Sequence, residues 1–202
     1  MTRYAIFKHF PLHRTPIIHL VIVTTFFAGL FTAEGSVAFS LSSPEKTGVA
    51  ISGGSSYDPE PTFDFLQMSL CAIYDYEDIM PHPAPDPLKF KFELNAGGTD
   101  HPDTRLLTSF NFYAVYYLYA LSAPTMTPYI EGGAGIVYSD FQVEGQGLRL
   151  NFNPQAGIGC EWQPHPDHTL FTAFHAYHIS NGGLNSDNRG INGVLVQFGY
   201  YF

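Results

Sequence analysis

After residue 38 the chain consists of short apolar and aromatic segments that alternate with clusters of Gly, Pro, Asp and Asn. Segments of this kind, separated by turn-forming residues, predict β-strands joined by turns. We predict eight strands, over residues 46–55, 63–76, 88–97, 105–120, 127–139, 147–162, 168–180 and 190–202. No apolar run of 18 residues follows residue 38, so the pattern predicts no second helical membrane span.

The last predicted strand shows the sharpest alternation. Alternate residues from Val194 to Phe202 are apolar or aromatic, whereas the other face carries glycines and Gln197. This pattern predicts an antiparallel transmembrane β-barrel, with lipid outside and packed side chains inside. The terminal Phe202 also resembles the C-terminal assembly signal of bacterial outer-membrane proteins. A soluble lipocalin-like barrel or sandwich is the alternative, but the aromatic-rich strand at residues 110–119 would be an aggregation hazard in water.

The topology of an eight-stranded barrel with both ends in the periplasm determines which connections face outside. The outer connections are predicted at residues 58–61, 98–104, 140–146 and 181–189, and the periplasmic turns at residues 77–87, 121–125 and 164–167. The first periplasmic turn is unusually long and contains the Pro-rich residues 81–87, which the pattern does not explain. Since such a barrel encloses only side chains or one small ligand, a porin-like channel is excluded.

Residues 1–38 have the features of a secretory signal peptide. Basic residues occur at Arg3, Lys8 and Arg14, residues 16–33 are almost entirely apolar, and Ser36-Val37-Ala38 is a small-x-small cleavage site. We therefore expect cleavage after Ala38, which leaves one barrel domain over residues 39–202. Because the apolar run of 18 residues is just long enough to span a bilayer, an uncleaved membrane anchor is the alternative.

The predicted mature chain is strongly acidic. Removal of residues 1–38 lowers the number of Lys and Arg from nine to six and the number of Asp and Glu from 18 to 17, so the net charge becomes −11. A chain of this charge is a poor nucleic-acid binder. Cys71 and Cys160 lie in different predicted strands, so we expect no disulfide, and no His lies at a spacing that would complete a zinc site.

Candidate catalytic residues gather where the seventh and eighth predicted strands meet. His178 and Ser180 are two residues apart in a strand, so their side chains share a face. If the hairpin is symmetric about Asn185, residue 178 lies opposite 192 and residue 180 opposite 190. Asn192 has the parity of the apolar face, so Ser180, His178 and Asn192 are predicted to cluster on the outer wall near the extracellular end. His175 has the opposite parity and is expected to be a lumen or packing residue.

These residue types suit ester hydrolysis on a lipid. A Ser hydroxyl becomes a good nucleophile when a neighbouring imidazole takes its proton, and a third group must fix the tautomer of that imidazole. The amides of Asn181 and Asn188 are available to stabilise an oxyanion. No metal or organic cofactor is needed. A His-x-Ser pair is nevertheless common, and Ser-Asn-Gly-Gly at residues 180–183 is also ordinary turn chemistry.

The same residues carry a family resemblance. The stretch His178-Ile179-Ser180-Asn181-Gly182-Gly183-Leu184, then Asn188-x-Gly190-Ile191-Asn192 and a strand that ends in Phe, resembles the C-terminal signature of the lipid A 3-O-deacylase (PagL) family. The resemblance implies an eight-stranded barrel of the bacterial outer membrane that removes the acyl chain at position 3 of lipid A in lipopolysaccharide. It implies that Ser180 is the nucleophile, that His178 is the base, and that Asn181 and Asn188 serve the oxyanion.

The chain departs from the family pattern at one position, because Asn192 stands where the family has Glu. An Asn carbonyl can accept the imidazole N–H, but it cannot stabilise the imidazolium as an anion would. Asp187 is the nearest alternative acid in sequence, whereas Glu131 and Glu144 are remote. Two rival functions remain: a non-catalytic structural or adhesive barrel, and another lipid A-modifying activity such as acyl transfer. The acyl-chain specificity and the oligomeric state do not follow from the sequence.

Overall fold

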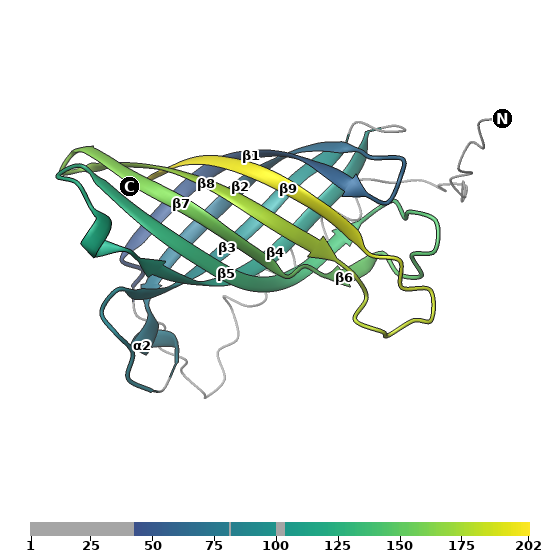
Figure 1. Cartoon of the computed structure of the whole chain (residues 1–202), viewed down its shortest axis with the longest axis horizontal. Coiled ribbons are helices and arrows are strands. Elements are labelled where there is room, and N and C mark those ends of the chain that lie inside the picture. Colours follow the sequence, from purple (N-terminus) through teal and green to yellow (C-terminus); the bar gives the residue numbers. More distant parts are fainter. Residues whose placement is uncertain (1–42, 81, 100–103) are drawn as a thin grey trace, which may run out of the picture. The chain divides into compact units, whose positions relative to one another are not determined.

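The computed structural model describes residues 43–80, 82–99 and 104–202, which form a closed antiparallel β-barrel (Figure 1). Nine strands make up its wall: β1 (Lys46–Asp58), β2 (Asp64–Asp75), β3 (Leu88–Thr99), β4 (Arg105–Tyr117), β5 (Met126–Ser139), β6 (Leu150–Phe152), β7 (Gln155–His165), β8 (His168–Ile179) and β9 (Ile191–Tyr201). Strands β1 to β5 pair in chain order, β5 pairs with both β6 and β7, β7 pairs with β8 and β8 with β9, and β9 closes the barrel against β1.

The short strand β6 and the strand β7 together occupy the position of the sixth strand in an eight-stranded wall. Phe152 lies opposite Ser180 and Gln155 lies opposite Tyr177, so the register across Asn153 and Pro154 is unchanged. The break arises because Pro154 has no N–H to donate to the ladder. The barrel is therefore eight-stranded, and the predicted fold is confirmed.

The strand bounds differ from the sequence prediction in a few places. The first strand continues to Asp58, which was predicted to begin a loop, and the fourth strand ends at Tyr117. The turns contain two short helices that the pattern did not predict, α2 (Tyr76–Ile79) and η1 (Tyr119–Leu121). In the described residues no helix is long and apolar enough to cross a membrane. The predicted signal peptide, residue 81 and most of the predicted connection at 98–104 lie outside the described residues.

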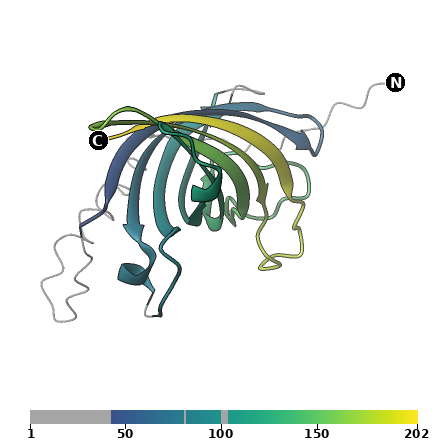
Figure 2. The ribbon, with the colours of Figure 1, turned by 60° about the vertical axis from the view of Figure 1, so that its left-hand side comes forward.

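The barrel has two rims, and the candidate site lies near one of them. We call the rim where β1 begins and β9 ends the terminal rim; α2 and η1 also lie on this side (Figures 1 and 2). The opposite rim, called the loop rim, carries the β1–β2, β5–β6 and β8–β9 connections. Figure 2 shows the strands side by side in a strongly curved wall.

The outer face of the wall is apolar. Its exposed side chains include Leu66, Met68, Leu70, Phe112, Ile130, Ile158, Phe174, Val196 and Phe198. Burial alternates residue by residue along β8 and most of β9, as a period of two requires. An apolar exterior around an interior that also holds many polar and charged side chains is the arrangement of a transmembrane barrel, so the predicted assignment of faces in the last strand is confirmed.

The inner face contains a buried ion cluster. Lys91 Nζ lies 2.5 Å from Glu131 Oε2 and 3.5 Å from Glu93 Oε2, and Glu131 also contacts His175 Nε2 at 2.6 Å. Each of these side chains is almost fully buried. Buried charges are retained when they are paired in this way, because an unpaired ion in a low-dielectric interior is very costly. The lumen location predicted for His175 is confirmed.

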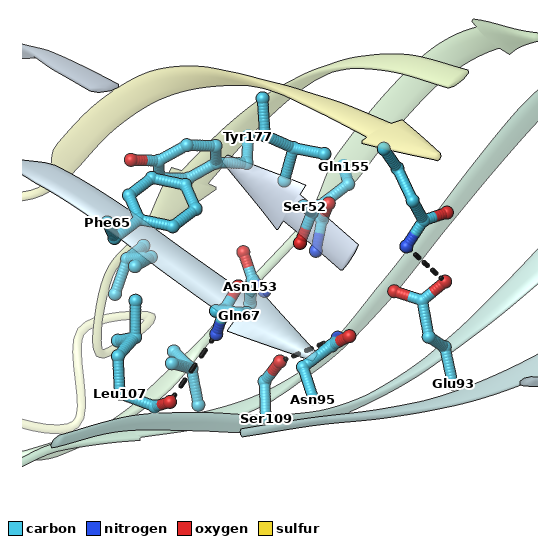
Figure 3. A pocket seen from close by; sticks show the side chains of 14 residues that line it. Ser52, Phe65, Gln67, Glu93, Asn95, Leu107, Ser109, Asn153, Gln155 and Tyr177 are labelled. Carbon is cyan, nitrogen blue, oxygen red and sulfur yellow. Dashed lines mark hydrogen bonds between the residues drawn. The ribbon is translucent and has the colours of Figure 1, made fainter. Parts of the chain in front are cut away.

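Side chains fill the rest of the lumen. Toward the loop rim a cavity of about 20 Å³ lies between Phe65, Gln67, Asn95, Ser109 and Tyr177, as the close-up in Figure 3 shows. Hydrogen bonds join Gln67 to the backbone of Leu107 and Asn95 to Ser109 (Figure 3). This volume holds about one water molecule. The lumen is therefore a packed interior, and a lipid-sized ligand must bind elsewhere.

Candidate functional site

His178 and Ser180 lie on the outer face of the wall, close to the loop rim. Tyr177 and Ile179, which alternate with them on β8, are buried in the lumen. The side chains of His178 and Ser180 are half-buried. The alternation of the strand therefore places both candidate catalytic groups on the lipid-facing side.

The register of the β8–β9 hairpin brings Asn192 to His178. The two residues are direct partners across the ladder. His178 Nδ1 lies 2.7 Å from Asn192 Oδ1, which is a good hydrogen-bond distance. The pairing of 178 with 192, predicted from hairpin symmetry, is confirmed.

The predicted pairing of Ser180 with Gly190 is wrong. The β8–β9 ladder stops at Ile179 and Ile191, and Ser180 instead exchanges two backbone hydrogen bonds with Phe152 of β6, at 2.8 and 3.1 Å. Just before Ile191 the chain lies outside the ladder, because residues 187 and 189 are hydrogen-bonded to the β5–β6 connection. Ser180 is consequently held by β6, on the side of β8 away from Asn192.

Gly190 lies against the imidazole of His178. A Cβ atom at this position would lie 2.5 Å from Cε1 and 3.1 Å from Nε2 of His178. Only glycine leaves room for the ring in its present position. Sequence reasoning had assigned no role to Gly190 beyond its place in the motif.

The β8–β9 connection, residues 180–190, is organised around the buried side chain of Asn181. Its amide donates to the backbone carbonyl of Asp187, and its Oδ1 accepts from the N–H of Gly183. The glycines Gly182 and Gly183 have φ of +63° and +85°, which L side chains rarely adopt. The amide of Asn181 therefore holds the loop in shape.

Asn188 is oriented by the same loop. Its Oδ1 accepts a 2.8 Å hydrogen bond from the backbone N–H of Asn181. The amide nitrogen of Asn188 is then the end of the side chain that can donate to another group. The structure thus places Asn188 on the exposed side of the loop and Asn181 beneath it.

The β5–β6 connection fastens this loop to the barrel. Gly147 N–H donates to the carbonyl of Asp187 at 2.7 Å, and Arg189 N–H donates to that of Gly145 at 2.8 Å. Gln146 and Asn188 form an isolated bridge between the two connections. The β5–β6 connection therefore holds the loop at the residues on both sides of Asn188.

The acids considered from the sequence are not the partners of His178. Glu131 is buried in the lumen cluster, and Glu144 is exposed on the β5–β6 connection. Asp187 takes part in the loop through its backbone groups. A different acid, Asp58 at the end of β1, accepts a 2.8 Å hydrogen bond from Asn192 Nδ2 and forms an ion pair with Arg189. Sequence reasoning missed Asp58, although barrel closure makes β1 the second neighbour of the last strand.

The assembled groups are of the types that acyl transfer uses. An imidazole with one nitrogen bonded to Asn192 has its other nitrogen available as a base, and a Ser hydroxyl lies two residues away on the same face. In the part of the chain that the structure describes, the Ser180 hydroxyl makes no hydrogen bond to His178, as is common in structures without substrate. No group of three or more described His, Cys, Asp or Glu side chains is placed to hold a metal ion.

Comparison with known proteins identifies the family. The model of the lipid A 3-O-deacylase (PagL) family matches residues 87–201, which is more than half of the chain. The chain belongs to the PagL family. No curated protein matches it in sequence.

Solved structures support the fold. The crystal structure of the outer membrane enzyme PagL is 19% identical, with a TM-score of 0.53, and the match covers 75% of this chain and 97% of that one. Neisserial surface protein A is 10% identical with a TM-score of 0.58, and the match covers 77% of this chain and 94% of that one. At these identities the likeness shows the barrel architecture, and the family match together with it places this PagL-family chain in the outer membrane.

Proposed function

We propose that this chain is a serine esterase that hydrolyses the 3-O-linked acyl chain of lipid A in the outer leaflet. The observation that carries the proposal is the hydrogen bond from His178 to Asn192 on the lipid-facing wall, two residues from Ser180. Family membership supports the choice of substrate. The loop rim then faces outside the cell, where the lipid A of lipopolysaccharide lies.

In the first step His178 acts as the general base. Asn192 Oδ1 accepts a hydrogen bond from Nδ1–H, so the neutral imidazole keeps its lone pair on Nε2. Nε2 takes the proton from the Ser180 hydroxyl as the oxygen attacks the ester carbonyl. As the tetrahedral intermediate collapses and the bond from the acyl carbon to the sugar oxygen breaks, His178 gives that proton to the sugar oxygen, which leaves as a hydroxyl. Water then gives a proton to His178 and attacks the acyl-enzyme; the bond to Ser180 Oγ breaks, His178 returns the proton to Ser180, and the fatty acid is released.

In this mechanism the oxyanion is stabilised from the β8–β9 loop. Asn188 donates from its amide nitrogen, because its oxygen is already bonded to the backbone of Asn181. Asn181 contributes by orienting Asn188 and by shaping the loop, since its own amide is bonded to Asp187. Removing one such donor typically costs a factor of about 10² to 10³ in kcat.

The surroundings of the site suit a substrate that is itself a membrane lipid. Phe152, which pairs with Ser180 from β6, and Phe174, earlier on β8, are exposed on the outer wall. An acyl chain that lies in the outer leaflet can approach Ser180 along this surface without entering the barrel. The packed lumen, with room for about one water molecule, cannot hold such a chain.

The experiment compares lipid A from Gram-negative cells that produce the wild-type chain with lipid A from cells that produce Ser180→Ala. We expect the wild type to remove one hydroxyacyl mass and Ser180→Ala to leave lipid A intact. Ser186→Ala, at an exposed serine of the same loop, is the matched control and should behave as wild type. Heat-modifiable migration on gels establishes that each variant is folded.

The outcomes separate the rival functions. Loss of a hydroxyacyl chain that depends on Ser180 supports the esterase. Gain of an acyl mass on a second lipid would instead indicate acyl transfer. An unchanged mass spectrum from a folded protein would refute deacylation of that lipid A. The non-catalytic barrel would then be preferred, and the uncharged Asn192 is the observation that favours it.

A further inference from the structure

Asp58 completes a chain of hydrogen bonds that begins at His178. His178 Nδ1 lies 2.7 Å from Asn192 Oδ1, and Asn192 Nδ2 donates to Asp58 Oδ2 at 2.8 Å. The other oxygen of Asp58 accepts from Arg189. We infer that Asp58 is a positioning residue, which supplies through Asn192 the carboxylate that orients His178. The inference rests on the proposed function, in which His178 is the general base.

The donor and acceptor chemistry of these groups makes the chain directional. An ionised carboxylate can only accept hydrogen bonds, so the Asn192 group that faces Asp58 must be the NH₂. The carbonyl of Asn192 must then face His178, and a carbonyl can only accept. The proton of the neutral imidazole is therefore held on Nδ1, which leaves Nε2 free to take the proton from Ser180. Asp58 thus specifies the tautomer of His178 without touching it.

A β-bulge in β1 gives Asp58 this position. Ser56 pairs with Gly193, yet Asp58 rather than Tyr57 pairs with Asn192. Ser52 and Ser56 face the lumen, so an unbroken alternation would have turned Asp58 inward as well. The extra residue reverses the parity and brings Asp58 to the face that Asn192 occupies. Bulges commonly re-aim a side chain next to a functional site.

The same contact explains why an amide suits position 192. The α-carbons of residues 58 and 192 are partners in the ladder. An acid at position 192 would place a second carboxylate directly beside Asp58, and like charges opposite one another destabilise a sheet. An amide satisfies both neighbours, since it accepts from His178 and donates to Asp58. In this chain the carboxylate lies one residue further from the imidazole.

A purely structural role for Asp58 would operate through its ion pair with Arg189. Both side chains are about half exposed, at 40% and 48% of their surface, and ion pairs of this kind contribute little. The variant Arg189→Gln removes this ion pair and leaves the contact between Asp58 and Asn192. It is therefore the matched control for Asp58→Asn, in which the amide at 58 can present either of its ends to Asn192.

The test measures kcat and KM for lipid A deacylation by purified wild type, Asp58→Asn, Arg189→Gln, Asn192→Glu and the double variant Asp58→Asn/Asn192→Glu. Loss of an outer residue that orients a functional His commonly costs a factor of about 10 to 100, so we expect Asp58→Asn to lower kcat by that factor with KM unchanged. Arg189→Gln should retain at least half of the wild-type kcat. With Glu at 192 the sign should reverse, and Asp58→Asn should raise kcat.

An equal loss in Asp58→Asn and Arg189→Gln, or a loss from Asp58→Asn in both backgrounds, would overturn the inference. A second measurement does not depend on activity. In ¹⁵N-histidine-labelled protein in micelles, with His178→Gln used for assignment, the neutral His178 ring should carry its proton on Nδ1, and Asp58→Asn should shift protons to Nε2. If wild type releases no acyl chain, the proposed function fails. The ring nitrogen that carries the His178 proton, compared between wild type and Asp58→Asn, then tests the role of Asp58 by itself. If the tautomer of His178 is unchanged in Asp58→Asn, the inference that Asp58 orients His178 through Asn192 is refuted, whatever the activity.

Discussion

Substitution of Gly190 by Ala tests the placement of the imidazole more sharply than removal of the ring does. The added methyl group would lie 2.5 Å from Cε1 and 3.1 Å from Nε2 of His178. Gly190 does not have a positive φ, so the backbone tolerates Ala, and the residue precedes β9 without belonging to it. The substitution should therefore act on the position of the ring and leave the barrel intact.

The contact distance determines the size of the effect. To restore an ordinary contact of about 3.5 Å, the ring must move by about 1 Å. A misplacement of about 1 Å in a catalytic group can cost a factor of about 10² in rate. This factor corresponds to about 2.7 kcal/mol in the activation barrier. We expect kcat to fall by about this factor and the resistance to urea to change by less than about 1 kcal/mol.

The assay follows the release of hydroxyacyl chains from purified lipid A by mass spectrometry, with urea unfolding measured on the same preparations. Gly53→Ala is the matched control, because Gly53 is an exposed glycine of β1 at which a Cβ meets nothing closer than 3.9 Å. If Gly190→Ala retains more than half of the wild-type kcat, either His178 is not the base or its present position is not the reactive one.

Three further substitutions probe the loop, the oxyanion and the lumen. Gly147→Val places Cβ 2.4 Å from Asn185 Oδ1 and should displace the β8–β9 loop, so we expect kcat to fall at least tenfold while urea unfolding stays near that of wild type. Asn188→Ala removes the proposed oxyanion donor and should lower kcat by a factor of about 10² to 10³ with KM little changed. A rise in KM with kcat unchanged would contradict this role. Lys91→Met leaves Glu131 and Glu93 without their cation and should destabilise the barrel by about 3–5 kcal/mol in urea unfolding, whereas Lys89→Met, at a partly exposed ion pair, should cost less than about 1 kcal/mol.

The inner face of the wall holds the residues that we expect to stabilise the barrel, and the outer face holds the candidate catalytic residues. The inner face holds the ion cluster of Lys91, Glu131 and His175 and a hydrogen-bonded network of amides and hydroxyls. The outer face carries His178, Ser180 and Asn192 among apolar residues. Because the alternation of a strand separates these sets, substitutions in the lumen should change stability, and substitutions on the outer wall near the loop rim should change activity.

Several features could be predicted from the sequence because they depend on local patterns. Apolar and aromatic segments between turn-forming residues marked the eight strands, and the alternation in the last strand identified its lipid-facing side. The assumed symmetry of the hairpin about Asn185 placed His178 opposite Asn192, which the register of the ladder confirms. Parity likewise assigned His175 to the lumen, where it contacts Glu131.

The tertiary structure decided what depends on contacts between distant segments. Barrel closure sets β1 beside β9, and the bulge in β1 then turns Asp58 toward Asn192, from which it is separated by most of the barrel in sequence. The β5–β6 connection binds the backbone of Arg189, so Gly190 does not pair with Ser180. Ser180 pairs instead with Phe152 of β6. Neither outcome follows from local periodicity. A single inserted residue changes the face on which the following side chain lies, and hydrogen bonds from another loop change which residues pair.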